Sequence, residues 1–196
     1  MKNKYQHNDD GTTHIFVESN NKRFPGKHTI IIDTEDWDKV KEHRWSIKAG
    51  SHDTTPYATT NIPHPDGLWR ISPYDGKRRR KHTLLHMHTL IKNSSQKKLV
   101  VDHINHNGLD NRKENLRTVT RAKNHQNRRP LVGGTSSYKG VCWHKRDKKW
   151  ISQIKSAGKK VWIGAFSCEH QAALAYNKKA LELWGEHAFL NEVEIQ

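Results

Sequence analysis

The chain has 196 residues, with 35 Lys and Arg against 20 Asp and Glu, so its formal net charge is +15 and its pI is near 9.9. The hydrophobic fraction is only 33%, but 7 Trp, 5 Tyr and 4 Phe argue against global disorder and allow one mid-sized domain or two to three small ones. This charge excess is typical of proteins that bind a polyanion, and a merely soluble basic protein is the alternative.

The cysteines and the amino-terminal sequence restrict further the class of protein to which the chain can belong. Cys142 and Cys168 lack CxxC spacing, which excludes a Cys-rich zinc site and argues against a disulfide framework. MKNKYQHNDDGTT contains no apolar stretch, and no basic amphipathic helix stands out. The sequence therefore predicts a cytoplasmic protein with reduced thiols and no membrane partner.

Residues 1–81 are expected to form a mixed, strand-rich region that contacts DNA. KHTIIID and PYATTNI are typical of strands, and TEDWDKVKEHRW of a short helix with acidic residues in its first turn. IPHPDGLWRISPYDG is rich in turn signals. The basic run that follows, together with Arg70, is expected to contact phosphates; it consists of Lys77, Arg78, Arg79, Arg80 and Lys81. The apolar alternation of HTLLHMHTLI comes next and is typical of a strand.

Residues 82–130 are predicted to be a second module. LVVDH is typical of a strand that ends at Asp102 and His103, NHNGLDN of a loop, NLRTVT of a second strand and RAKNHQNRR of a helix. Hydrolysis of a phosphodiester requires an activated water, stabilised phosphate charge and help for the departing oxygen, and a hard cation held by oxygen ligands supplies the last two. Asp102 and the amide of Asn124 suit Mg²⁺ (or Mn²⁺), and His103 suits the water. Consecutive strand residues point to opposite sides, so Asp102 and His103 should diverge.

DHINHNGLDNRKENLRTVT and HMHTLI resemble HNH endonucleases of the phage- and intron-associated homing type. The resemblance implies that Asp102 and Asn124 bind the metal, that His103 is the general base and that Asn115 braces the loop. It places His88 either near the substrate or packed under the site. The chain has Thr89 where the family usually has Arg, and His106 where it often has Gly or Asp. The alternative is that the Asn and His residues only cap turns, and Asn107, Asp110 and Asn111 are expected to do no more than that. Further DNA contacts are expected from Arg117 and Arg121.

HQNRRPLVGGTSS leads into a predicted linker, residues 131–137, before a third module at residues 138–196. YKGVCWHK, KWISQIKS and KKVWIGAFS are typical of strands, and CEHQAALAYNKKALELWG of an amphipathic helix. The residues expected on the apolar side of that helix are Ala172, Ala173, Tyr176, Ala180 and Leu183. The order KGV, KW-xx-QI, VWIG-xF, AA-xAY and A-xLN resembles the ethylene-response-factor (Apetala-type) DNA-binding domain, which implies a three-stranded antiparallel sheet packed on one helix.

Alternation along these strands divides their side chains between two faces. Those expected to face the helix are Val141, Trp143, Trp150, Ile154, Val161 and Ile163. Those expected to face DNA are Cys142, His144, Gln153, Lys155, Lys160 and Trp162. The plant-type domain has Arg at several positions where this chain has Cys142, His144 and Lys155, so the base sequence read by plant relatives is not carried over.

Together these patterns predict an α+β protein with a central ββα-metal nuclease module, a carboxy-terminal sheet on one helix and a strand-rich amino-terminal region. Its expected function is metal-dependent cleavage of double-stranded DNA by a mobile-element endonuclease acting in the host cytoplasm, without a small-molecule cofactor. One site per chain favours nicking by a monomer, although a dimer could cut both strands. A non-catalytic DNA-binding regulator is the alternative, and RNA binding is a weaker third reading.

Overall fold

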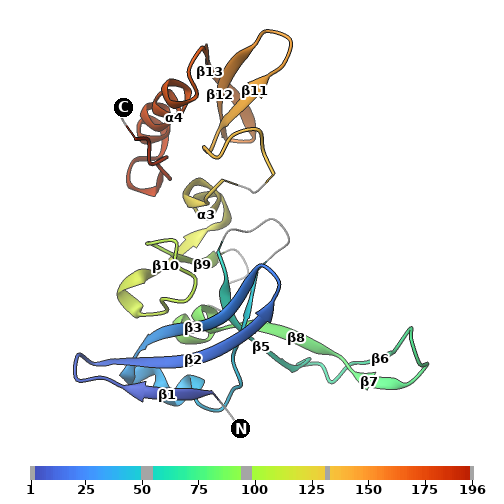
Figure 1. Cartoon of the computed structure of the whole chain (residues 1–196). Coiled ribbons are helices and arrows are strands. Elements are labelled where there is room, and N and C mark those ends of the chain that lie inside the picture. Colours follow the sequence, from blue (N-terminus) through green and yellow to red (C-terminus); the bar gives the residue numbers. More distant parts are fainter. Residues whose placement is uncertain (1–2, 50–54, 94–98, 131–132, 195–196) are drawn as a thin grey trace. The chain divides into compact units, whose positions relative to one another are not determined.

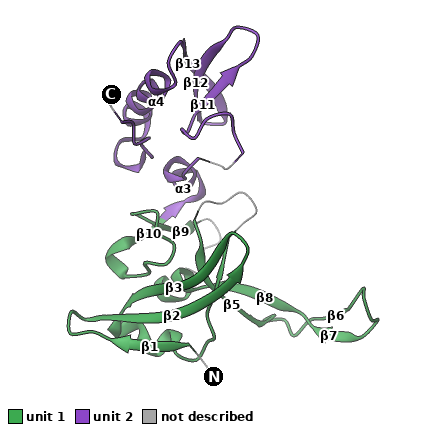
Figure 2. Ribbon diagram, in the orientation of Figure 1, with its two compact units in different colours: residues 1–49, 55–118 green, residues 50–54, 119–196 purple. Residues whose placement is uncertain are grey.

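The computed structural model describes residues 3–49, 55–93, 99–130 and 133–194, so Leu131 and Val132 of the expected linker lie outside the described residues. The chain divides into two compact units (Figure 2). Within the described residues, the first unit contains residues 3–49, 55–93 and 99–118, and the second contains 119–130 and 133–194. Mixed α and β structure is present in both units.

The first unit begins with an antiparallel sheet of β1 (Lys4–His7), β2 (Thr12–Asn21) and β3 (Phe24–Asp33). Alternate residues of β2, including Ile15 and Val17, are buried, as a strand with one face on a core requires. The strand predicted at KHTIIID is confirmed as the second half of β3, where Ile30 and Ile32 have no exposed surface.

A short helical segment and a second sheet follow. The 3-10 turn η1 (Thr34–Asp36) leads into α1 (Trp37–Val40), so the predicted helix is a single turn. The second sheet has the order β4 (Ser46–Lys48), β5 (Tyr57–Pro63), β8 (His82–His86). A two-stranded ribbon of β6 (Trp69–Ile71) and β7 (Arg78–Arg80) lies between β5 and β8 in sequence (Figure 1).

The strand expected across HTLLHMHTLI ends at His86, and Met87–Lys92 form helix α2 instead. Met87 and Ile91 are four residues apart and both buried, which places them on one helical face toward the core. Asn93, in the left-handed region with φ of 45°, ends the helix. The alternation was misleading because a run of this length also fits a buried helix.

The central motif has the predicted order of elements: β9 (Leu99–His103), a loop ending in the 3-10 turn η2 (Lys113–Asn115), β10 (Leu116–Thr120) and α3 (Arg121–Asn127). Strands β9 and β10 pair with each other. The Thr120 side chain accepts a hydrogen bond from the Lys123 amide and caps α3.

The second unit contains the predicted three-stranded antiparallel sheet, in the order β11 (Val141–His144), β12 (Lys149–Ser156), β13 (Lys159–Phe166). Helix α4 (Glu169–Trp184), followed by the turn η3 (Gly185–His187), packs on this sheet. Leu183, expected on the packed side of the helix, is 39% exposed. The side chains that pack against the helix residues are Val141, Trp150, Ile154, Val161 and Ile163.

Helix α3 is tied to the sheet-and-helix part of the second unit by Lys139. Its Nζ donates to the carbonyl oxygens of Gln126 at 2.6 Å and His125 at 3.3 Å, and it lies over the rings of Trp184 and Phe189. Burial lowers the pKa of Lys139 to about 8. This cation therefore ties the carboxyl end of α3 to the rest of the unit.

None of the helices within the described ranges combines the length and the apolar character that a membrane span requires.

Candidate functional site

His103, the last residue of β9, is buried among polar and aromatic side chains of the first unit. Its side chain is nearly fully buried, and its Nε2 lies 3.4 Å from Oδ1 of Asn111 in the following loop. The ring of Tyr57 in β5 lies 5.7 Å from the His103 ring, and that of His88 in α2 lies 4.9 Å away, edge to face. Three elements distant in sequence thus meet at this imidazole.

His103 belongs to an aromatic cluster of four residues: Tyr57, His86, His88 and His103. His86, at the end of β8, stacks on His88 with a ring separation of 5.1 Å, and Tyr57 contacts both rings edge to face. In and beside this cluster, three buried nitrogens have no hydrogen-bond partner among the described residues: Nδ1 of His86, Nδ1 of His88 and Nδ2 of Asn111. Unpaired buried donors and acceptors are costly, so their concentration around one imidazole is a mark of a functional site.

The histidines of the cluster are held neutral. Burial lowers the pKa of His103, against a smaller opposing effect from the hydrogen bond to Asn111. Burial also lowers the pKa of His86, and burial together with the neighbouring His103 and His86 lowers the pKa of His88 to about 3. A neutral imidazole can accept a proton near pH 7, which is the requirement for a general base.

The buried histidines predict a specific acid sensitivity. His88 has a pKa of about 3 in the folded chain and an ordinary value of 6.5 when unfolded, so the unfolded chain binds the extra proton between these pH values. The free energy of unfolding should therefore be intact above pH 6.5 and fall below it, with His88 contributing up to about 1.4 kcal/mol per pH unit. Denaturant titrations at several pH values measure this, and the free energy of unfolding should depend less steeply on pH in His88→Phe than in the parent. The same slope in both would contradict the prediction, and exposed His82→Phe is the control.

Asp102 faces a different partner from its neighbour His103. Its Oδ2 accepts hydrogen bonds from Nε and Nη2 of Arg117 in β10, both at 3.0 Å. This two-pronged ion pair fixes the carboxylate at the end of β9. Arg117, expected to contact DNA, thus holds Asp102 here, and its contact with DNA remains a prediction. Asp102 is a hard oxygen donor beside the cluster, and its chemistry fits one carboxylate ligand of a Mg²⁺ ion that retains several waters.

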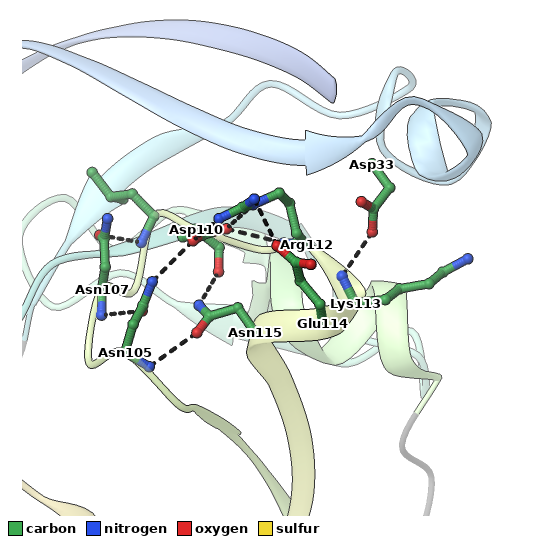
Figure 3. Close-up of polar contacts among 9 residues, drawn as sticks. Asp33, Asn105, Asn107, Asp110, Arg112, Lys113, Glu114 and Asn115 are labelled. Carbon is green, nitrogen blue, oxygen red and sulfur yellow. Dashed lines mark hydrogen bonds and ion pairs between the residues drawn. The ribbon is translucent and has the colours of Figure 1, made fainter. Parts of the chain in front are cut away.

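Asn115 spans the loop between β9 and β10 (Figure 3). Its Oδ1 accepts from the amide of Asn105 at 2.9 Å, and its Nδ2 donates to the carbonyl oxygen of Asp110 at 2.8 Å. Asp110 in turn accepts from Asn105 and pairs with Arg112; burial raises its pKa, but these hydrogen bonds hold it below the ordinary value. Asn115 therefore joins both ends of the loop that follows the Asp-His pair.

The same loop is fastened to the first sheet and to β5. The amide of Lys113 donates to Asp33 at 2.7 Å, and the main chain of Ile31 bonds to the loop on either side of Asp110. A Cβ at Gly108 would clash with the Pro56 carbonyl oxygen and the Tyr57 ring, so only glycine allows this close approach. His106 adopts φ of 59°, in the left-handed region that glycine adopts more readily than other residues.

Asn124 lies in α3 and belongs to the second unit, as do Arg121 and His125. Asn124 is half-buried, and Arg121 and His125 are exposed. The role of Asn124 as a second metal ligand and that of Arg121 as a DNA contact remain predictions.

The structure places the remaining predicted DNA contacts on two surfaces. The exposed basic run of residues 77–81 includes all of β7. On the carboxy-terminal sheet, Gln153 is paired with Trp162 and Lys155 with Lys160 in adjacent strands. His144 is exposed and lies 3.2 Å from Asp147, whereas Cys142 is half-buried. Trp143, expected to pack toward the helix, lies edge to face on Trp150.

Sequence reasoning missed three members of this site: Tyr57, His86 and Asn111. Asn111 was expected only to shape a turn, yet it is fully buried against His103. Tyr57 comes from a strand 46 positions before His103, and nothing in its local sequence indicates this contact. His86 had a signal, because it stands two residues before His88 in the upstream element.

Three acidic ligand atoms lie close together elsewhere among the described residues, at Asp33, Glu35 and Asp36. Lys113 pairs with Glu35 at 2.6 Å and lies 3.5 Å from Asp36, which also pairs with Lys39. Glu35 and Asp36 are thus neutralised by lysines, and Asp33 accepts from the Lys113 amide, as expected of a structural network of ion pairs and hydrogen bonds.

Comparison with known proteins identifies both segments. The family model "HNH endonuclease" matches residues 94–126, and the model "AP2 domain" matches residues 136–186. An AP2-like ethylene-responsive transcription factor of Arabidopsis thaliana is 37% identical over 68 residues, which are 35% of this chain and 14% of the plant protein. A second ethylene-responsive transcription factor of that plant is 39% identical over 72 residues, 36% of each chain. The chain thus spans little more than a third of these relatives at most.

An uncharacterized HNH endonuclease of Acanthamoeba polyphaga mimivirus is similar along most of the chain. It is 26% identical over 171 residues, which are 87% of this chain and 79% of the viral protein. The HNH match contains Asp102, His103, Asn115 and Asn124, and the AP2 match contains the sheet of β11 to β13 and all of α4. The chain therefore has the combined architecture of an HNH endonuclease domain followed by an AP2 domain.

Proposed function

We propose that this protein is a divalent-metal-dependent endonuclease of the homing type that cleaves double-stranded DNA. The observation that carries the proposal is the setting of His103. A buried, neutral imidazole lies at the end of β9, oriented by Asn111 and adjacent in sequence to a carboxylate that Arg117 fixes. His103 and Asp102 thus have separate partners. This separation suits a hydrolysis in which the nucleophile and the metal act on different sides of the phosphate.

Each residue of the motif has a role in this proposal. His103 accepts a proton from the attacking water, and Asn111 holds the ring in orientation. Asp102, with Asn124 of α3 as the second ligand that the motif implies, would hold Mg²⁺ or Mn²⁺ as in a ββα-metal site; the cation would stabilise charge on the phosphate and on the leaving oxygen. Asn115 fixes the loop that carries Asn111. His88 packs against His103 and excludes bulk water from one side of its ring.

Supercoiled plasmid tests the activity directly. With Mg²⁺ or Mn²⁺ the protein should convert a plasmid carrying its target to the nicked form, as expected of one site per chain, and with EDTA it should not. Because the target sequence is unknown, a library of random inserts should be screened at low salt, where DNA binding is strongest. If no insert is cut with either metal while DNA is still bound, the non-catalytic regulator is the better reading.

The AP2 domain supplies DNA affinity through the exposed face of its sheet. Lys155 and Lys160 are both exposed and form a cross-strand pair. If each contacts a phosphate, Lys155→Gln/Lys160→Gln should lower the slope of log affinity against log salt by about 1.8, because each contact contributes about 0.9. Fluorescence anisotropy at several salt concentrations measures the slope. As a control, Lys41 and Lys179, which pair with Asp38 and Glu182, should be changed to Gln with little effect. An unaltered slope in the first variant would exclude this face as the DNA contact.

A further inference from the structure

The ribbon of β6 and β7 is the part of the first unit that is least explained by packing. All six strand residues are exposed, so neither face of the ribbon is covered by the core. In Figures 1 and 2 the ribbon extends beyond β5 and β8, away from the sheet of β1 to β3. A two-stranded hairpin is marginally stable in water by itself. Its paired residues are Trp69 with Arg80, Arg70 with Arg79, and Ile71 with Arg78.

One face of the ribbon presents two guanidinium groups on an aromatic support. The guanidinium carbon of Arg78 lies 4.9 Å from the centre of the Trp69 ring, and that of Arg80 lies 5.9 Å away. Stacking on the ring restricts these long side chains, so less conformational entropy is lost when they bind an anion. The face is therefore preorganised for phosphate.

The turn that joins the strands is held by contacts of Asp75, and apolar side chains lie at and beside it. Asp75 accepts from the amide of Lys77 at 3.3 Å and pairs with Arg79 at 2.6 Å, and these contacts also offset its negative charge. Ile71 is 73% exposed and Tyr74 is 97% exposed. Pro73, between them, is exposed as well. Apolar side chains at the end of a basic arm are the groups with which minor-groove proteins separate base pairs.

We propose that the β6–β7 ribbon is a DNA-binding arm whose tip enters the minor groove. Arg78 and Arg80 contact the phosphates on either side of the groove, and Ile71 and Tyr74 insert between base pairs at the tip. Residues 77–81 are five consecutive cations, and the carboxylate beside them, Asp75, is paired with Arg79. This excess of positive charge indicates a polyanion as the partner. The exposed apolar side chains at the tip, Ile71 and Tyr74, distinguish this arm from a surface that is only basic. The proposal rests on duplex DNA being the substrate, as proposed above, and is independent of cleavage.

The tip is tested with Ile71→Ser/Tyr74→Ser in the full chain. Binding to a short A·T-rich duplex is measured by anisotropy in EDTA, where metal-dependent cleavage does not occur. The variant should bind about tenfold more weakly, as expected for the loss of stacking contacts, with an unchanged salt slope because no charge is lost. The control is Leu174→Ser/Leu181→Ser, which removes two apolar side chains of α4 that are 46% and 50% exposed. Unchanged thermal unfolding shows that the variants are folded.

The groove and the phosphate contacts are tested separately. Netropsin, which fills the minor groove of A·T tracts, should weaken binding of the parent to the level of the tip variant and have little effect on that variant. Arg78→Gln/Arg80→Gln should lower the salt slope by about 1.8, whereas Lys41→Gln/Lys179→Gln should not. Full affinity of the tip variant, equal effects of netropsin on both proteins, or a preference for single-stranded DNA would each overturn the proposal. Failure to cut DNA would refute the nuclease but leave these binding results intact.

Discussion

Replacing His103 with alanine should lower the rate of DNA cleavage about 10²- to 10⁴-fold, the usual loss when a general base is removed. The affinity for target DNA should remain close to that of the parent, because His103 is nearly fully buried and contacts Asn111, Tyr57 and His88. Single-turnover cleavage at saturating protein, with anisotropy in EDTA for affinity, separates the two effects. Cleavage at the parental rate would overturn the assignment of the base.

The dependence of the rate on pH provides a second readout for His103. A general base must be deprotonated, so the rate should rise with pH through the imidazole pKa and then level off. Because burial lowers the pKa of His103, the inflection should lie below 6.5 and the rate should be level near pH 7. The His103→Ala variant should lose this inflection. The control His28→Ala, which alters a half-buried histidine of β3, should retain both the rate and the pH profile.

Local sequence was sufficient to predict the elements that lie close together in the chain. The strands β9 and β10, and the three strands and the helix of the carboxy-terminal module, form where the patterns of apolar residues placed them. Their periodicity reflects one buried face per element, which is a local property. Helix α2 was missed for a related reason. Its short apolar run fits both the alternation typical of a strand and, at Met87 and Ile91, the spacing typical of a helix, so the core around it decides which one forms.

The surroundings of His103 could not be predicted in the same way. Tyr57 and His86 reach the site from neighbouring strands of one sheet, β5 and β8, whose pairing is a tertiary contact. Gly108 permits that approach because a side chain there would collide with Tyr57, yet in the sequence it is an ordinary loop glycine. From the sequence, Arg117 was expected to contact DNA, and its contact with Asp102 follows only from the pairing of β9 with β10. Sequence motifs thus identify the reacting groups, whereas their partners depend on the fold.

Removal of the Asp102 carboxylate should abolish most of the metal-dependent activity. A bound cation contributes several kcal/mol to stabilisation of charge during phosphodiester hydrolysis, so Asp102→Asn should reduce the rate by about 10³-fold or more. The amide keeps the size of the side chain and can still accept a hydrogen bond from Arg117, so the fold should persist. Asp38→Asn, which alters an exposed carboxylate of α1 paired with Lys41, is the matched control.

Metal binding itself should depend on DNA. Asp102 and Asn124 would provide only two protein oxygens, and Mg²⁺ gives up its waters reluctantly, so the free protein should bind Mg²⁺ weakly and phosphate oxygens should strengthen the binding. Calorimetric titration of His103→Ala, which should hold DNA and cut it only slowly, measures this gain. Adding Asp102→Asn to that variant should remove the gain while DNA affinity in EDTA stays the same. Tight Mg²⁺ binding to the free protein that Asp102→Asn does not alter would show that the cation is held elsewhere, since a lost ligand must weaken the site to which it belongs.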